Sequence, residues 1–182
     1  MVKLIKKKIV YKNKWIQITK KNIHFKYKGL GDYYSIDQKD YVYIILQTQK
    51  RLFPMVKQYR HAIDKYTLEF PSGTIEKNQK PSDCAKKEAL EETGHKINKL
   101  TKIATLYPDI GRLSNRVHMF FGISNDKNIK KIEKKEEIKV FYYSKNEILN
   151  LIKNNKIIHQ PHIGLFFFSK ITKSNLKIRN LS

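Results

Sequence analysis

The stretch GTIEKNQKPSDCAKKEALEETGH, residues 73–95, contains three closely spaced glutamates, Glu88, Glu91 and Glu92. In a helix, residues three and four apart share one face. Carboxylates this close raise one another's pKa unless a cation lies between them. A hard divalent ion such as Mg²⁺ prefers oxygen ligands and leaves positions for water and phosphate oxygens. The spacing therefore predicts a metal site that handles phosphate.

Helix signals surround these glutamates. Pro81 suits a first helical turn, Ser82 and Asp83 offer capping oxygens, and Gly94 suits a left-handed C-terminal position. We expect a helix over residues 82–93. A solvated charged face, balanced by neighbouring lysines, is the alternative explanation for the acids. The Pro-Ser-Gly turn predicted just before this stretch favours the metal site.

The stretch resembles the signature of the Nudix hydrolases. In that family a glycine is followed by five residues, a glutamate, seven residues and then Arg-Glu-aliphatic-x-Glu-Glu-x-Gly-aliphatic. This chain departs from the pattern at three positions, with Gln79 for the first glutamate, Lys87 for the arginine and His95 for the last aliphatic residue. The positions that match are Gly73, Glu88, Ala89, Glu91, Glu92 and Gly94.

The resemblance implies how a metal would be bound. The three glutamates would hold Mg²⁺, with Mn²⁺ as an alternative, Glu91 would also be catalytic, and the carbonyl of Ser72 would complete the metal shell. Lys87 keeps a positive charge that can orient a carboxylate, although it lacks the rigid fork of donors of arginine. Gln79 removes one charge while the helix glutamates remain. We therefore expect metal binding to survive with lower affinity.

Two upstream runs resemble the family branch that acts on ADP-ribose and nucleoside diphosphate sugars. They are KQYR at 57–60 and TLEFPSG at 67–73. The resemblance implies that Arg60 and Glu69 contact the substrate, because a guanidinium can hold two phosphate oxygens at once. A surface arginine at a strand end is the alternative.

A downstream loop, YPDIG at 107–111, resembles the Tyr-Pro-Ser-Pro-Gly loop of that branch. Ile110 and Asn115 stand where the ADP-ribose branch has a proline and an acid, so the identity of the diphosphate stays open. Arg112 is a candidate substrate ligand, and simple solvent exposure explains it equally well.

The resemblance also implies a general base from a charged loop before a late strand. That loop is residues 130–137, with Glu136 and Glu137 as candidates and Glu133 behind them. A solvated lysine-rich turn explains the same acids equally well.

Length and composition are those of one compact domain. The chain has 182 residues, enough to bury a core without disulfides. Its single cysteine, Cys84, excludes an internal disulfide and fits a reducing compartment. The basic N-terminus lacks the apolar segment of a signal peptide, and no apolar run approaches the roughly 20 residues of a membrane span. We expect a cytoplasmic protein with no membrane association.

The net charge of +22 suggests binding to polyanions. However, only five of the 38 basic residues are arginine, and the lysines are spread along the chain among many Asn and Ile residues. This composition favours a genome-wide bias over a built nucleic-acid site, while non-specific association with RNA is still expected. A basic protein that binds nucleotides or RNA without turnover is the alternative to an enzyme, and the retained glutamates favour the enzyme.

The order of expected elements predicts an α+β fold, consistent with the α/β/α sandwich and mixed sheet of the family. We expect residues 1–38 to form a β-rich extension, with a dimer contact implied by the resemblance, and residues 39–182 to form the Nudix domain. His159 and His162 lack the spacing of a known zinc site, and Pro161 between them predicts a helix start. The expected strands are 8–11, 15–19, 23–27, 41–48, 52–59, 66–70, 100–107, 116–123 and 138–143, and the late helices are 146–153 and 161–172.

Overall fold

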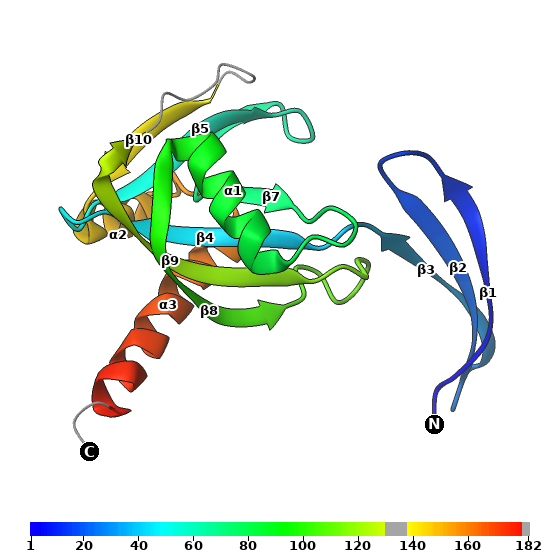
Figure 1. Ribbon diagram of the computed structural model, residues 1–182. Helices are drawn as coiled ribbons and strands as arrows, with labels where there is room; N and C mark the ends of the chain where they lie inside the picture. Colours follow the sequence, from blue (N-terminus) through cyan, green and yellow to red (C-terminus); the bar gives the residue numbers. More distant parts are fainter. Residues whose placement is uncertain (130–137, 180–182) are drawn as a thin grey trace. The chain divides into compact units, whose positions relative to one another are not determined.

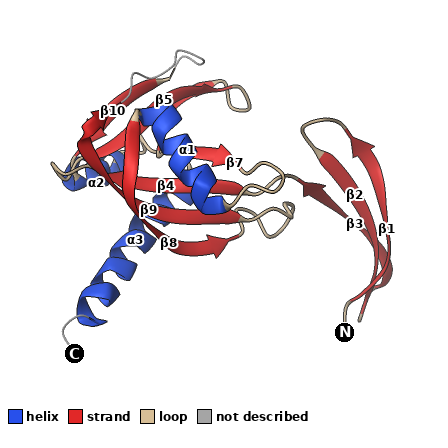
Figure 2. Ribbon diagram, viewed as in Figure 1, coloured by secondary structure: helices blue, strands red, loops and turns tan. Residues whose placement is uncertain are grey.

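The computed structural model describes residues 1–129 and 138–179. By its internal contacts the chain divides into two units, one formed by residues 1–40 and 106–117 and the other by residues 41–105 and 118–182. Figures 1 and 2 show the elements of each unit. The return of residues 106–117 to the first unit has no signal in the sequence, because it depends on pairing between distant segments.

The first unit contains an antiparallel sheet in the order β1-β2-β3. Its strands are β1 (Lys3–Lys12), β2 (Gln17–Phe25) and β3 (Gly29–Asp37). Residues 106–117 join this unit through β3, because the Ile36 N–H donates to the Arg112 carbonyl at 2.8 Å and the Ser114 N–H donates to the Ile36 carbonyl at 3.1 Å.

The predicted N-terminal strands were too short, and β3 was missed. Lys20 and Asn22 fall between the predicted strands 15–19 and 23–27, yet both lie in β2 and contact Asp32 of β3, with a Lys20 Nζ–Asp32 Oδ2 distance of 2.6 Å. Opposite charges across an antiparallel pair stabilise a sheet. The turn lies instead before Gly29, whose φ of 70° favours glycine.

The second unit carries two sheets, ordered β10-β5-β6 and β7-β4-β9-β8. Strands come first, one helix follows β7 and further helices come late, so the expected α+β class is confirmed. The elements are β4 (Tyr41–Gln47), β5 (Phe53–Arg60), β6 (Lys65–Glu69), β7 (Ser72–Thr74), α1 (Pro81–Thr93), β8 (His95–Leu106), β9 (Val117–Ile129), β10 (Lys139–Tyr143), α2 (Lys145–Lys153) and α3 (Gln160–Arg179).

Strand β4 lies at the centre of the core. Successive side chains of a strand point to opposite faces. Val42, Ile44 and Leu46 therefore share one face, where they cluster with Ala85 and Ala89 of α1. The two small alanines let this helix approach the sheet closely.

The opposite face of β4 contacts α3, which lies behind the sheet in Figure 1. Tyr43 meets the ring of His162 edge-on, with ring centroids 4.4 Å apart. Phe70 stacks on Phe166 at 6.0 Å. The two helices thus fix β4 from both sides and leave the neighbouring ends of β5, β6 and β7 to shape a site.

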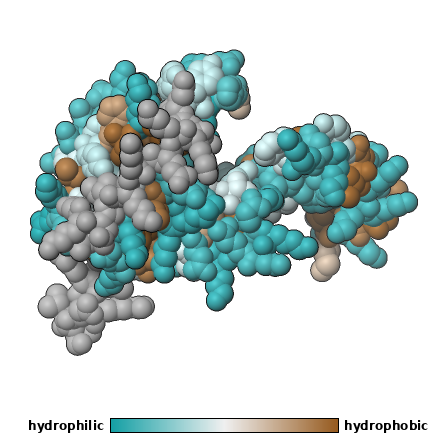
Figure 3. All heavy atoms as spheres, turned by 45° about the horizontal axis from the view of Figure 1, so that its top comes forward, coloured by the Kyte–Doolittle hydropathy of each residue, from teal (hydrophilic) through white to brown (hydrophobic). Residues whose placement is uncertain are grey.

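The N-terminal sheet exposes apolar side chains, among them Leu4, Ile9 and Tyr11 of β1. Hydrophobic residues are visible over this sheet in Figure 3. The expected dimer contact there stays a prediction. Within the described part of the chain, none of the helices has the length and apolar character required to cross a membrane.

Candidate functional site

Helix α1 begins at Pro81, one residue earlier than predicted, and ends at Thr93. Gly94 closes it with a φ of 77°, and its N–H donates to the Leu90 carbonyl at 2.9 Å. The helix is therefore fixed at the end where Glu92 lies.

Glu88 of α1 lies directly against the backbone of β7. A methyl group built on Gly73 would meet the Glu88 Cδ atom at 2.2 Å. Only glycine allows this approach, which explains why the motif requires it.

We expect Gly73→Ala to displace the Glu88 side chain and to lower metal affinity by at least tenfold. Mg²⁺ or Mn²⁺ binding followed by calorimetry tests this. Gly164→Ala is the matched control, because a Cβ there meets nothing within 4 Å and alanine favours a helix. Unchanged metal affinity in Gly73→Ala would contradict the prediction.

Glu92 is held against β7. Its Oε2 atom accepts a hydrogen bond from the Ser72 N–H at 2.9 Å. Burial raises the pKa of Glu92 to about 8, repulsion from Glu88 adds to the increase, and the Ser72 hydrogen bond opposes it. A bound cation would reverse this pKa shift, because it stabilises the ionised carboxylate.

Glu91 faces a different direction from the other two glutamates. Its side chain is 57% exposed and lies 3.5 Å from the Lys87 Nζ atom, which is also 3.9 Å from Glu88. Glu91 is absent from the described residues that line the cavity beside Glu88 and Glu92. Lys87 does orient neighbouring carboxylates, as its charge suggested.

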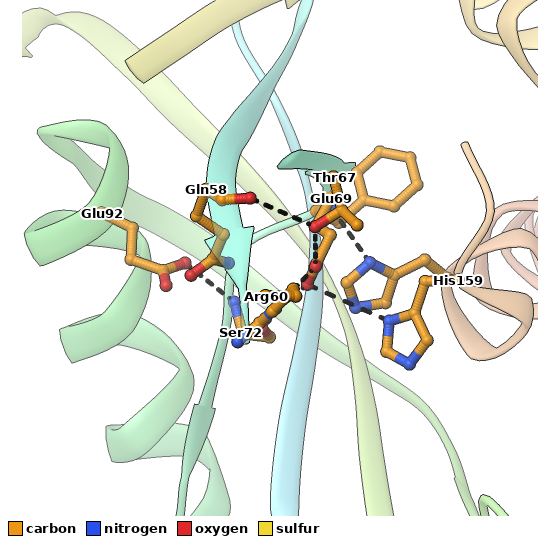
Figure 4. A network of polar contacts seen from close by, with 9 residues as sticks. Gln58, Arg60, Thr67, Glu69, Ser72, Glu92 and His159 are labelled. Atoms are coloured by element: carbon orange, nitrogen blue, oxygen red, sulfur yellow. Dashed lines mark hydrogen bonds and ion pairs between the residues drawn. The ribbon is translucent and has the colours of Figure 1, made fainter. Parts of the chain in front are cut away.

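The two half-buried glutamates, Glu88 and Glu92, open onto a cavity of about 790 Å³. In Figure 4, Arg60 lies between Glu92 on one side and His159 on the other. The lining residues are Tyr41, Tyr43, Gln58, Arg60, Ala62, Ile63, Thr67, Glu69, Ser72, Gly73, Thr74, Glu88, Glu92, Ile158 and His159.

Arg60 and Glu69, both predicted to contact substrate, form an ion pair with each other. The Arg60 Nε and Nη2 atoms donate to the two Glu69 oxygens at 2.7 and 2.5 Å. Burial alone would raise the pKa of Glu69, but the hydrogen bonds from Arg60 and Thr67 lower it to about 2. Glu69 is therefore an anion at neutral pH although its side chain is 2% exposed.

Two histidines at the start of α3 lie beside Glu69, and the sequence analysis missed this. The His159 Nδ1 atom lies 4.0 Å from Glu69 Oε2. Potential metal-ligating atoms of Glu69, His159 and His162 lie within 4.8 Å of one another. Ninety residues separate the carboxylate from these rings in the chain, so no local pattern could have joined them.

Comparison with known proteins identifies the family. A model of the NUDIX domain matches residues 38–163. The chain belongs to the NUDIX family.

It is 29% identical over 118 residues to an ADP-ribose pyrophosphatase of Bacillus subtilis, and the match covers 64% of each chain. It is 27% identical over 123 residues to a GDP-mannose pyrophosphatase of Salmonella typhimurium, over 63% of this chain and 64% of that protein. The chain thus spans just under two thirds of the length of these relatives.

The fold has a counterpart among solved structures. A crystal structure of an ADP compounds hydrolase superposes with a TM-score of 0.81 at 13% identity, over 96% of this chain and 95% of that one. This likeness confirms the expected fold, including the N-terminal strands.

Two departures from the NUDIX signature have local explanations. Gln79 accepts a hydrogen bond from the Glu76 N–H at 3.0 Å, so the amide stabilises the loop before α1. His95 is buried, and its two ring nitrogens lie 2.9 Å from the Tyr142 hydroxyl and 3.2 Å from the Ser124 hydroxyl. These contacts compensate for a polar ring at a position that is aliphatic in the signature.

The remaining candidates belong to other parts of the chain. Arg112 is in the first unit, where its guanidinium lies over the Tyr33 ring at 5.6 Å. Its contact with a substrate stays a prediction. Glu133, Glu136 and Glu137 lie outside the described residues.

Proposed function

We propose that this protein hydrolyses the diphosphate linkage of a nucleoside diphosphate derivative, namely ADP-ribose or another nucleoside diphosphate sugar. The observation that carries the proposal is one cavity lined by two α1 carboxylates, Glu88 and Glu92, and by the guanidinium of Arg60. Carboxylates suit a divalent ion and arginine suits phosphate, and a diphosphate substrate in this family needs both.

The donor set fits Mg²⁺ or Mn²⁺. Glu88 and Glu92 would hold the ion together with the Ser72 carbonyl. Glu91 would join them only by turning away from Lys87, with which it pairs in this structure. The raised pKa of Glu92 supports this assignment, because burial and repulsion from Glu88 outweigh the attraction of Arg60 and so favour a further cation nearby. When bound, the ion would neutralise phosphate charge and acidify an attacking water.

The protein's own groups would position the substrate. Arg60 keeps guanidinium donors beyond those that it gives to Glu69, and these can reach a phosphate oxygen. The backbone of Ser72 and Gly73 holds the two carboxylates in place. Glu91 would assist catalysis, Glu136 or Glu137 would accept the proton of the attacking water, and Arg112 would contact the substrate. Such positioning and charge neutralisation carry most of the catalysis of phosphoryl transfer.

The relatives support this substrate class. The Bacillus subtilis protein is named for ADP-ribose and the Salmonella protein for GDP-mannose.

We further propose that the protein forms a homodimer and acts in the cytoplasm.

A second function is favoured by the charge alone. A net charge of +22 would let the chain associate with RNA, and a protein that binds without turnover would use the same surface.

A panel of substrates separates these two functions. We expect metal-dependent cleavage of ADP-ribose or GDP-mannose in the presence of Mg²⁺ or Mn²⁺ and none with chelator, measured by release of nucleoside monophosphate. A diadenosine polyphosphate and capped RNA complete the panel. If no compound is cleaved and RNA binds with a steep dependence on salt, the binding protein is the correct function.

A further inference from the structure

His159 lines the cavity, and one of its ring nitrogens lies beside a buried anion, Glu69. His159 directly precedes α3, and its side chain is 36% exposed. The Nδ1 atom is buried and has no hydrogen-bond partner among the residues that the structure describes. It points toward Glu69 in Figure 4, while the second ring nitrogen points away from that carboxylate. The outward nitrogen is therefore available to a ligand in the cavity.

The surroundings of His159 hold this ring orientation. The ring of Tyr43 meets it edge-on at 5.6 Å, and the ring of His162 lies 4.4 Å away. Glu69 behind it is fixed by hydrogen bonds from Arg60 and Thr67. A carboxylate behind a histidine stabilises the protonated ring and aims its outer N–H, as in other sites where an acid orients a histidine.

A metal ion is a poor occupant of the group formed by Glu69, His159 and His162. The Nδ1 atom of His162 accepts a hydrogen bond from the Phe70 N–H at 3.2 Å, which places the proton of this neutral ring on Nε2. A metal would require that nitrogen to be deprotonated. Arg60 already binds both oxygens of Glu69. These contacts favour an anion beside His159 over a cation.

The described lining of the cavity offers a diphosphate few positively charged side chains. Arg60 is the permanent cation among the described lining residues, and its charge is offset by Glu69. His159 is the other lining side chain in the described part of the cavity that can become positive near neutral pH. A protonated His159 would therefore add a second positive charge from the protein, beside that of the metal ion in the proposed function.

We propose that His159 is a phosphate ligand of the cavity, which takes up a proton when a diphosphate binds beside Arg60. The proposal rests on the proposed function, since it assumes that the cavity receives a diphosphate. In the bound state the outer N–H of the His159 ring donates to a phosphate oxygen. The negative charge of Glu69, on the Nδ1 side, stabilises the protonated ring. Such a charge-assisted hydrogen bond is stronger than one from a neutral ring.

The groups that face His159 set the direction of its titration. Burial lowers the pKa of His159, Glu69 raises it and Arg60 lowers it further. The neighbouring His162 stays neutral, because burial lowers its pKa to about 3. Tyr43, on the remaining side, is also neutral, since burial raises its pKa to about 12. A bound phosphate adds a second anion and so raises the pKa of His159.

The test follows the histidine ring signals by nuclear magnetic resonance during pH titration, with inorganic pyrophosphate and chelator and without any metal. His159→Gln identifies the signal. We expect the His159 midpoint to lie below that of an ordinary histidine in the free protein. It should rise by about one pH unit or more with saturating pyrophosphate, which is a tenfold change in proton affinity. Pyrophosphate affinity should fall about tenfold in His159→Gln, in line with the loss of one charged hydrogen bond.

A His159 midpoint that does not respond to pyrophosphate overturns the proposal, whether or not the protein hydrolyses a nucleotide. Failure of the proposed function is a separate result, namely no metal-dependent cleavage in the substrate panel. A stoichiometric Zn²⁺ site that is lost in both His159→Gln and His162→Gln would also overturn the proposal and assign the cluster to a metal.

Discussion

The Glu92→Gln variant is expected to lose metal-dependent hydrolysis by about 10³-fold in kcat/KM. Removing this carboxylate takes one ligand and one negative charge from the ion, and stabilisation by a metal amounts to several kcal/mol of barrier, or roughly three powers of ten. The amide can still accept the hydrogen bond that the Ser72 N–H gives to Glu92 at 2.9 Å. The loss should therefore come from the site and not from misfolding.

The same substitution should stabilise the metal-free protein. The pKa of Glu92 rises to about 8 in the fold, so the folded chain holds a proton at pH 7 that the unfolded chain releases. The contribution of Glu92 to stability is therefore fully present below about pH 4.5 and is lost as pH rises toward 8. At pH 7 this loss lowers the unfolding free energy by roughly 3 kcal/mol. Glutamine carries no such penalty. Urea unfolding in chelator should show a more stable variant, and Mg²⁺ should stabilise only the wild type.

Asp83→Asn is the matched control for Glu92→Gln. It removes one negative charge from the same helix at an exposed position in the first turn. Its hydrolysis should stay within a factor of about two of the wild type, because surface charges interact weakly with distant groups. Full activity in Glu92→Gln would mean that the catalytic metal is not held at this position.

The Arg60→Gln variant is expected to lose about 3 kcal/mol of unfolding free energy. It leaves the carboxylate of Glu69, 2% exposed, without its cation, and breaking a buried pair in this way typically costs roughly 3–5 kcal/mol. Arg60 is itself 43% exposed, so water that enters should hold the loss to the lower end of that range. Urea unfolding at pH 7 measures it.

The double variant Arg60→Gln with Glu69→Gln tests the cause. It removes both charges together and should recover most of the stability, because no buried ion is left unpaired. A double variant no more stable than Arg60→Gln would show that the arginine acts through packing and not through its charge.

The ion pair also predicts the response to acid. The pKa of Glu69 is lowered to about 2, so its stabilising contribution is fully present above about pH 4.5 and is lost as pH falls toward 2. Glu69→Gln should show a smaller loss of stability across this window than the wild type. Equal losses in the two proteins would contradict the assignment.

Local sequence patterns predicted helix α1 and the acidic residues on it that face the cavity. A proline start, a glycine stop and glutamates at helical spacing are all properties of neighbouring residues, so the sequence alone located α1 within one residue of its observed start. The strands predicted at 41–48 and 52–59 likewise agree with β4 and β5 to within one residue at each end. The strand β3 was missed because its stability comes from contacts of polar side chains with β2, such as the pair formed by Lys20 and Asp32.

By itself the sequence determined the family, the α+β class and the acidic face of α1, because these depend on spacing within short stretches. Only the tertiary structure decided which groups meet in the cavity. It separated Glu91 from Glu88 and Glu92, paired Arg60 with Glu69 and brought His159 within 4.0 Å of that carboxylate. Such contacts depend on how the strands and α3 pack across the core. Residues ninety positions apart in the chain leave no local sequence pattern from which their contact could be predicted.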